Sequence, residues 1–117
     1  MTGIAGERDR ILALLSLTDD PTVRETDAVP TAEDVGASDA LGLDWPDEQA
    51  HVSVYLFAAY ADAAAAQERL QGYGAQTGLT VETAINGDLL LWAVAPRDDD
   101  RALARVDGLA GSFSGRE

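Results

Sequence analysis

The stretch TAINGDLLLWAV, residues 83–94, constrains the fold more than any other part of the chain. The Asn86-Gly87 pair is typical of a two-residue hairpin turn, which joins two neighbouring antiparallel strands. Leu89, Leu90 and Leu91 follow almost directly, so the second strand carries leucine on both of its faces. One face meets the core, and the other needs a cover from elsewhere.

The Asn-Gly loop predicts the register of this hairpin, with Ala84 opposite Leu89. One face of the hairpin is richer in apolar residues and contains Leu79, Val81, Thr83, Ile85, Leu90, Trp92 and Val94. We expect this face to pack against helices, together with Val52, Val54 and Leu56. The second face contains Leu89 and Leu91, and we expect Tyr55 and Phe57 to join them. These four residues form the predicted interaction face.

The order of elements after residue 50 predicts the fold class. Alternating residues predict strands over 51–58, 79–85 and 88–95. Helices are predicted from 62 to about 72 and from about 98 onward, with apolar stripes of Ala63, Ala66, Leu70 and Tyr73 and of Leu103, Val106, Ala110 and Phe113. This βαββα order resembles five of the six elements of a ferredoxin-like unit. We therefore expect an α+β fold, a three-stranded antiparallel sheet with two helices on one face. The missing sixth element would leave strand 51–58 as an open edge.

Residues 1–50 have a different composition and are expected to form a separate segment, followed by a ferredoxin-like domain over 51–117. A short helix is predicted over about 5–16, with Ile11, Leu14 and Leu15 on one side. An acidic strap without sustained periodicity follows it. Within the strap, residues 31–34 form a capping box for one helical turn, and three apolar anchors near its end are Leu41, Leu43 and Trp45.

Three covers for the second sheet face stay open at this point. The N-terminal helix or the strap around Trp45 could fold over it. Two copies of the chain could pack face to face as a homodimer. A ligand or a foreign protein could occupy it, because soluble monomers rarely leave a large apolar patch bare.

The charge of the chain excludes several classes of partner. Twenty-one acids stand against eight arginines with no lysine, for a net charge of -13 at pH 7. Binding to nucleic-acid phosphates or anionic lipids requires clustered Lys and Arg, so we expect neither a nucleic-acid nor a membrane partner. The lack of lysine also removes Schiff-base and P-loop chemistry. A high-GC genome or a high-salt cytoplasm gives such a composition, and so does a surface that docks on a basic partner.

Length and apolar patterning indicate one soluble domain. A chain of 117 residues supports one modest core, and no run of eighteen apolar residues spans a membrane. The early apolar stretch, residues 11–17, follows mixed charges and lacks the cationic start and cleavage site of a signal peptide. We therefore expect a cytoplasmic protein. The chain has no cysteine, which excludes disulfides and thiol chemistry.

Several residues resemble parts of catalytic or metal sites, yet none forms a complete motif. His51 is the single histidine, and nearby acids such as Asp44 would raise its pKa, but a surface position is typical of such a residue. The aspartates at 98–100 lack the spacing of a calcium loop and suit a helix start. Glu82 and Asp88 are a pair of carboxylates without a known separation.

Glycine and serine patterns near the helix ends are similarly incomplete. Gly72, Gly74 and Gly78 have neither the spacing nor the strand-to-helix context of a dinucleotide fingerprint. Ser112 and Ser114 flank a Phe where a nucleophile elbow needs Ser. We predict no catalytic residue, no cofactor and no metal ligand.

The sequence thus predicts a small acidic non-enzymatic interaction or regulatory domain. It would bind a protein partner or a second copy of itself through the face of Tyr55, Phe57, Leu89 and Leu91, or through the open strand edge. One alternative is a small-molecule sensor or enzyme of the dimeric α+β-barrel type, with His51 or Tyr55 in a pocket under that face. A weaker alternative is an inhibitor that mimics nucleic acid.

Overall fold

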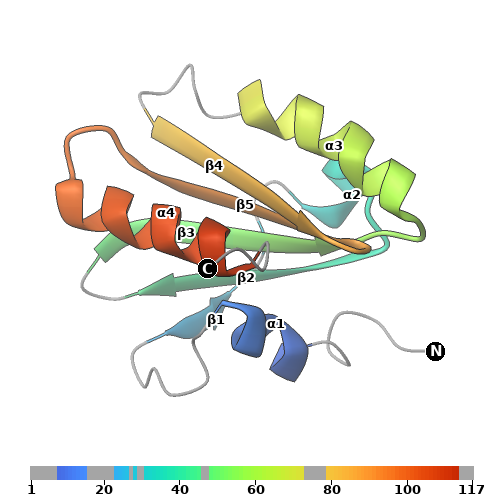
Figure 1. Ribbon diagram of the computed structural model, residues 1–117, viewed down its shortest axis with the longest axis horizontal. Coiled ribbons are helices and arrows are strands. Elements are labelled where there is room, and N and C mark those ends of the chain that lie inside the picture. The colour runs from blue at the N-terminus through green and yellow to red at the C-terminus, as the bar shows by residue number, and fades with distance from the viewer. Residues whose placement is uncertain are drawn as a thin grey trace.

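Five strands form one antiparallel sheet in the order β1-β2-β3-β5-β4 (Figure 1). The computed structural model describes residues 8–15, 23–26, 28, 31–45, 48–72 and 79–113. In chain order these residues form α1 (Arg8–Leu14), β1 (Arg24–Thr26), α2 (Ala32–Val35), β2 (Asp39–Trp45), β3 (Glu48–Leu56), α3 (Tyr60–Gly72), β4 (Leu79–Asn86), β5 (Leu89–Pro96) and α4 (Asp100–Phe113).

The predicted three-stranded, ferredoxin-like sheet with two helices on one face is wrong, although the class is α+β. The expected open edge, β3, is the middle strand and pairs with both β2 and β5. β2 comes from the acidic segment, where Gly42 and two aspartates weaken the strand pattern. Leu43 and Trp45 are buried, as predicted for apolar anchors, but they belong to a strand of the sheet and not to an extended strap. The sheet thus draws β1 and β2 from residues 1–50, and a boundary at residue 50 falls inside β3.

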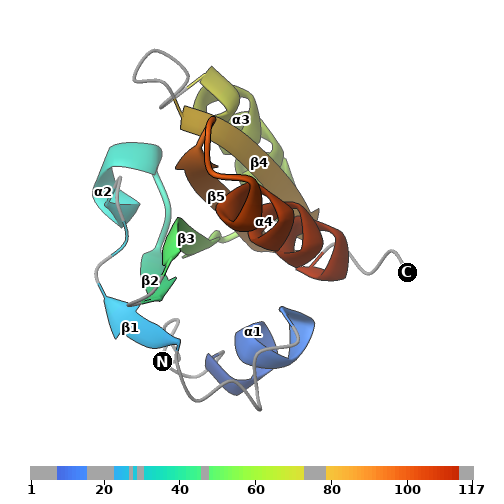
Figure 2. The same ribbon diagram turned by 90° about the vertical axis from the view of Figure 1, so that its left-hand side faces the viewer.

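The sheet has helices on both faces. We call them the α4 face and the α3 face, after the longer helix on each. Buried residues of the α4 face, which α1 also covers, are Ile11, Leu15, Leu43, Trp45, Ala50, Val52, Val54, Ala84, Leu89, Leu91, Ala93, Ala95, Ala102, Val106, Leu109, Ala110 and Phe113. Those of the α3 face are Ala28, Val35, Tyr55, Phe57, Ala63, Ala66, Leu70, Leu90, Trp92 and Val94. Figure 2 shows α1 and α4 on the same side of the sheet.

The hairpin of β4 and β5 has the predicted faces but a different register. Its turn consists of Gly87 and Asp88, with Asn86 opposite Leu89, and Gly87 has a φ of 64°, which residues with a side chain rarely adopt. Ala84 therefore lies opposite Leu91 and not opposite Leu89, a difference of two residues in the pairing. Because side chains alternate with a period of two, a difference of two residues leaves every side chain on the face predicted for it.

The prediction for β3 is wrong, because its two faces are exchanged. Tyr55 lies opposite Leu90, and Val54 lies opposite Leu91. Val52 and Val54 therefore pack with the leucines of the α4 face, while Tyr55 lies on the α3 face. β3 is apolar on both sides because helices cover both, so its alternation alone does not say which face meets which helix.

The helices confirm their predicted stripes but not their common side. α3 buries Ala63, Ala66 and Leu70 as predicted, whereas Tyr73 lies outside the described residues. α4 packs its stripe against the opposite face, with Val106, Ala110 and Phe113 buried and Leu103 partly buried. There it meets α1, whose Ile11 and Leu15 are also buried. Of the three covers considered for the second face, the structure has the N-terminal helix, with the addition of α4.

The described part of the chain is compact and has no membrane-spanning helix. The radius of gyration is 13.0 Å, close to the value of about 13 Å expected for a folded domain of this length. Among the described helices, none has the length and apolar character needed to cross a bilayer.

Candidate functional site

The structure does not bring the four residues of the predicted interaction face together. Tyr55 and Phe57 lie on the α3 face, and Leu89 and Leu91 lie on the α4 face. Tyr55, Leu89 and Leu91 are 0% exposed and Phe57 is 3% exposed. The surplus leucines of the hairpin therefore form internal core of a single chain, and we look for an interaction surface elsewhere.

The sheet ends in two edge strands of different length and character. β1 has three residues, all exposed, of which Arg24 and Glu25 are charged. β4 has eight residues and pairs with β5 along its whole length without a register shift. Native proteins protect sheet edges with short strands, charged side chains, proline or bulges. β1 has two of these features, whereas β4 has a single charged residue, Glu82, and no proline.

The register decides which backbone groups of the edge strands point outward. In an antiparallel pair, residues that exchange both hydrogen bonds with the partner alternate with residues whose N–H and C=O groups point away. Asn86 and Leu89 close a two-residue loop and are of the first kind. The hydrogen bond from N of Phe57 to O of Asp88, at 2.9 Å, fits the same alternation across β3 and β5. On β4, the residues whose backbone N–H and C=O groups point away from β5 are therefore Leu79, Val81, Thr83 and Ile85. On β1, the backbone groups of Glu25 alone point away from β2.

The side chains of these outward residues form a half-buried rim beside α3. Leu79, Val81 and Ile85 are partly buried against the apolar cluster of the α3 face. Gln67 of α3 donates from Nε2 to Oγ1 of Thr83 at 3.1 Å, which fixes the middle of β4 against the helix. In Figure 1, β4 lies at the margin of the sheet beside α3. β4 thus combines a regularly paired backbone edge with apolar side chains that are only partly covered.

The charges that flank β4 are mainly negative. α3 exposes Asp62 and Glu68, and α4 exposes Asp100 and Asp107. The same helices carry three arginines. Arg101 is exposed, Arg69 donates from Nη2 to O of Val35 at 2.8 Å, and the guanidinium of Arg105 lies 4.7 Å from the ring centre of Trp45. With Glu82 of β4 and the net charge of -13 of the whole chain, the excess of acids favours an approaching cation over an anion.

A polar cluster crosses β1, β2 and β3 on the α3 face. Arg24 donates from Nε to Oδ1 of Asp44 at 3.2 Å, and Asp44 lies opposite His51. Nε2 of His51 lies 3.1 Å from Oγ of Ser53 and shares a hydrogen bond with it. Sequence reasoning considered His51 but missed Ser53. The i, i+2 spacing on a strand, which puts both side chains on one face, was the available sign.

Burial controls the protonation of His51. Desolvation lowers the pKa of His51 below its ordinary value of 6.5, and the nearby Asp44 carboxylate opposes this shift. The expectation that neighbouring acids raise the net pKa is therefore wrong, because burial outweighs them.

The free energy of unfolding should consequently decrease as the pH falls through about 6.5. The folded state favours neutral His51, so this contribution is complete above the unfolded pKa. It is lost between 6.5 and the lower folded pKa, where the unfolded chain binds the extra proton. Urea unfolding of the wild type and of His51→Gln at pH 8, 7, 6 and 5.5 measures it. The difference between the two proteins should shrink or reverse with falling pH, and a constant difference would contradict the assignment.

The polar cluster around His51 does not present an accessible nucleophile. Asp44, His51 and Ser53 are the residue types of a hydrolase triad, but Ser53 is 0% exposed, so a substrate carbonyl cannot reach its hydroxyl. Ser112 donates from Oγ to O of Leu14 at 2.6 Å. Ser114 lies outside the described residues, as do Gly74 and Gly78.

The carboxylates that resembled parts of a site in the sequence cap a helix or lie apart from one another. Asp99 accepts from N of Ala102 at 3.0 Å at the start of α4, as expected of acids at a helix N-terminus. Glu82 lies opposite Ala93, whereas Asp88 lies in the turn, so the hairpin does not bring the two together. Among the described residues, no group of three or more His, Asp and Glu side chains is placed to hold a metal ion.

An open cavity of about 300 Å³ lies where β1, α2 and β2 meet, and its lining includes Thr26, Ala28, Thr31, Ala32, Asp39 and Ala40. The carboxylate of Asp39 already accepts from its neighbour, N of Ala40, at 2.8 Å. His51 and Tyr55, the handles expected of a small-molecule site, are not part of this lining. The edge of β4 is therefore the stronger candidate site. Comparison with protein-family models, with curated proteins and with solved structures finds no match to this chain.

Proposed function

We propose that this chain is a small, non-enzymatic interaction domain that binds an extended segment of a basic partner protein as an additional strand beside β4. The observation that carries the proposal is the long, regular and almost uncharged edge of β4. Such an edge is a template for strand addition. The short and charged β1 is protected against the same pairing.

Backbone geometry supports the proposed mode of binding. A partner strand would hydrogen-bond to the outward N–H and C=O groups of Leu79, Val81 and Ile85. Each such bond has a net value of about 0.5–1.5 kcal/mol. The side chains that the partner strand places on the α3 side would also cover the half-exposed apolar atoms of this rim. The backbone hydrogen bonds thus supply affinity, and the apolar rim and the nearby charges determine which partner is preferred.

Charge supports a basic partner over a second copy of the chain. Two copies would each bring a net charge of -13 to the interface, which opposes association at moderate ionic strength. A lysine- or arginine-rich strand meets the acids of α3 and α4 with the opposite sign. The cytoplasm is the proposed compartment, since the early apolar residues Ile11 and Leu15 are core of the folded domain.

A pair of proline variants tests the proposed edge. Proline removes an N–H group, and at an outward position it breaks no bond within the sheet. Val81→Pro should weaken binding of a strand-forming peptide, valine and threonine alternating with lysine, by about ten-fold, because it removes one outward donor and distorts the edge. Glu25→Pro, the matched change on β1, should leave binding unchanged. Isothermal titration of both variants and the wild type measures this, after thermal unfolding confirms that each is folded.

Three outcomes would contradict the proposal. One is equal binding by Val81→Pro and the wild type. Another is equal binding of a control peptide with glutamate in place of lysine, which would remove the role of charge. The third is that the wild type elutes as a dimer whereas Val81→Pro elutes as a monomer, because the edge of β4 would then bind a second copy of the chain.

A further inference from the structure

α1 is an amphipathic helix that fills a seat on the α4 face. Ile11 and Leu15, four residues apart, are 0% and 2% exposed and belong to the same buried cluster as Leu43 and Leu91. Figures 1 and 2 show α1 next to β1 and β2, on the side of the sheet that α4 covers. We call the part of the α4 face beneath α1 the α1 seat.

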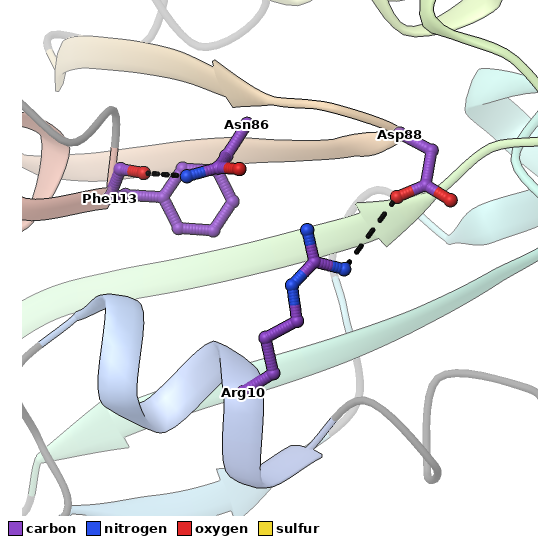
Figure 3. A network of polar contacts seen from close by, with 4 residues as sticks. All are labelled: Arg10, Asn86, Asp88 and Phe113. Atoms are coloured by element: carbon purple, nitrogen blue, oxygen red, sulfur yellow. Dashed lines mark hydrogen bonds and ion pairs between the residues drawn. The ribbon is translucent and has the colours of Figure 1, made fainter.

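Polar contacts at the rim of the seat include an ion pair and a hydrogen bond. Arg10 and Asp88 form an ion pair with Nη1 and Oδ1 3.9 Å apart (Figure 3), and their side chains are 43% and 45% exposed. Exposed pairs at this distance contribute little and are screened by salt. At the other end, Ser112 of α4 donates to O of Leu14. The hairpin turn itself is tied to α4, since Asn86 donates to O of Phe113 at 3.0 Å (Figure 3).

α1 contributes no strand to the sheet, so no ladder between strands depends on it. A helix of seven residues is not stable by itself, and its order depends on the seat. α4, in comparison, has fourteen residues and five buried ones. Departure of α1 uncovers leucine side chains and a free carboxylate at Asp88, which together form a groove for another helix.

From this arrangement we propose that the α1 seat is a second interaction site, which accepts a basic amphipathic helix of a partner protein in exchange for α1. The partner helix presents two apolar side chains four residues apart in the places of Ile11 and Leu15. It presents a cation to Asp88 in the place of Arg10. The net negative charge of the chain attracts the cations of such a helix.

The probe for this site is a fluorescent peptide with the sequence of residues 4–17. In the wild type, α1 competes with it, so the apparent affinity falls by the fraction of seats that are open. The full-length double variant Ile11→Asp and Leu15→Asp keeps its own helix out of the seat. It should bind the peptide at least roughly ten-fold more tightly than the wild type. Ala13→Asp, on the exposed side of α1, adds charge without emptying the seat and should bind like the wild type.

Peptide variants identify the chemistry of the partner. A peptide with aspartate at positions 11 and 15 should not bind, and one with Arg10→Glu should bind more weakly than the original. Val81→Pro should leave all of these values unchanged, which separates this site from the edge of β4. The proposal is overturned if the double variant is folded but binds no peptide, if it unfolds, which would make α1 an inseparable part of the core, or if the wild type is a dimer that exchanges α1 between copies.

Discussion

Leu91→Asp is expected to unfold the protein. Leu91 is fully buried on the α4 face, with Val54 opposite on β3 and Ala84 opposite on β4. An aspartate there loses the apolar packing and places an unpaired carboxylate in the core. The expected loss exceeds about 4 kcal/mol, a large part of the roughly 5–15 kcal/mol that stabilise a domain. Far-UV circular dichroism and the dispersion of amide signals in an NMR spectrum measure the outcome.

Graded changes at the same position provide the control for Leu91→Asp. Leu91→Met keeps the volume and should cost less than about 1.5 kcal/mol, and Leu91→Ala should cost about 2–5 kcal/mol. This order shows that enclosure, not a local backbone preference, sets the effect. A folded Leu91→Asp protein with the wild-type melting temperature would mean that Leu91 faces an open surface and that α1 and α4 do not cover it.

Trp92→Ala is expected to have the second largest effect, a loss of about 3–5 kcal/mol. Trp92 is 3% exposed and lies in the cluster of the α3 face with Leu70 and Val94. Its Nε1 donates to O of Leu70 at 2.9 Å, a buried bond that joins β5 to the last turns of α3. Urea unfolding followed by circular dichroism measures the loss.

Trp92→Phe separates the hydrogen bond from the packing. The phenyl ring keeps much of the buried area but leaves the carbonyl of Leu70 without its donor, which should cost about 1–3 kcal/mol. If Trp92→Phe were as stable as the wild type, the bond to Leu70 would contribute nothing. If it were as unstable as Trp92→Ala, the ring would contribute nothing beyond the bond.

The features that could be predicted from the sequence depend on contacts between near neighbours in the chain. The Asn-Gly pair predicted the hairpin of β4 and β5, and its faces are confirmed by the pairing of the two strands. The capping residue Thr31 accepts from N of Asp34 at 3.3 Å, as the capping box predicted. The stripe of α3 is confirmed because a period of 3.6 residues identifies a buried face wherever the helix packs.

The features that could not be predicted depend on distant parts of the chain. The alternation in β3 is apolar on both faces, so the register with β5 alone decides whether Tyr55 or Val54 accompanies Leu91. Likewise, a stripe on α4 shows that the helix is packed but not on which side of the sheet. The segment that forms β2 is predicted to be a strap because it is acidic and has no sustained periodicity, and the error in the number of strands follows from that.

The candidate site shows the same division. The residues of β4 were predicted to form a strand, and their lack of lysine and proline is visible in the sequence. Whether β4 exposes an unprotected edge depends on the order of strands in the sheet, because only an edge strand needs protection against pairing. The sequence predicts an open edge at β3, but β3 is the middle strand, and the two edge strands are β1 and β4.

Amide hydrogen exchange of the wild-type protein, with and without the lysine-containing strand peptide, tests the central claim most directly. The outward amides of Val81 and Ile85 should exchange quickly in the free protein and slow down when the peptide is bound, because they acquire hydrogen-bond partners. The amide of Glu25 on β1 should not change. Slower exchange at Glu25, or unchanged exchange at Val81 and Ile85 with the peptide bound, would contradict the account.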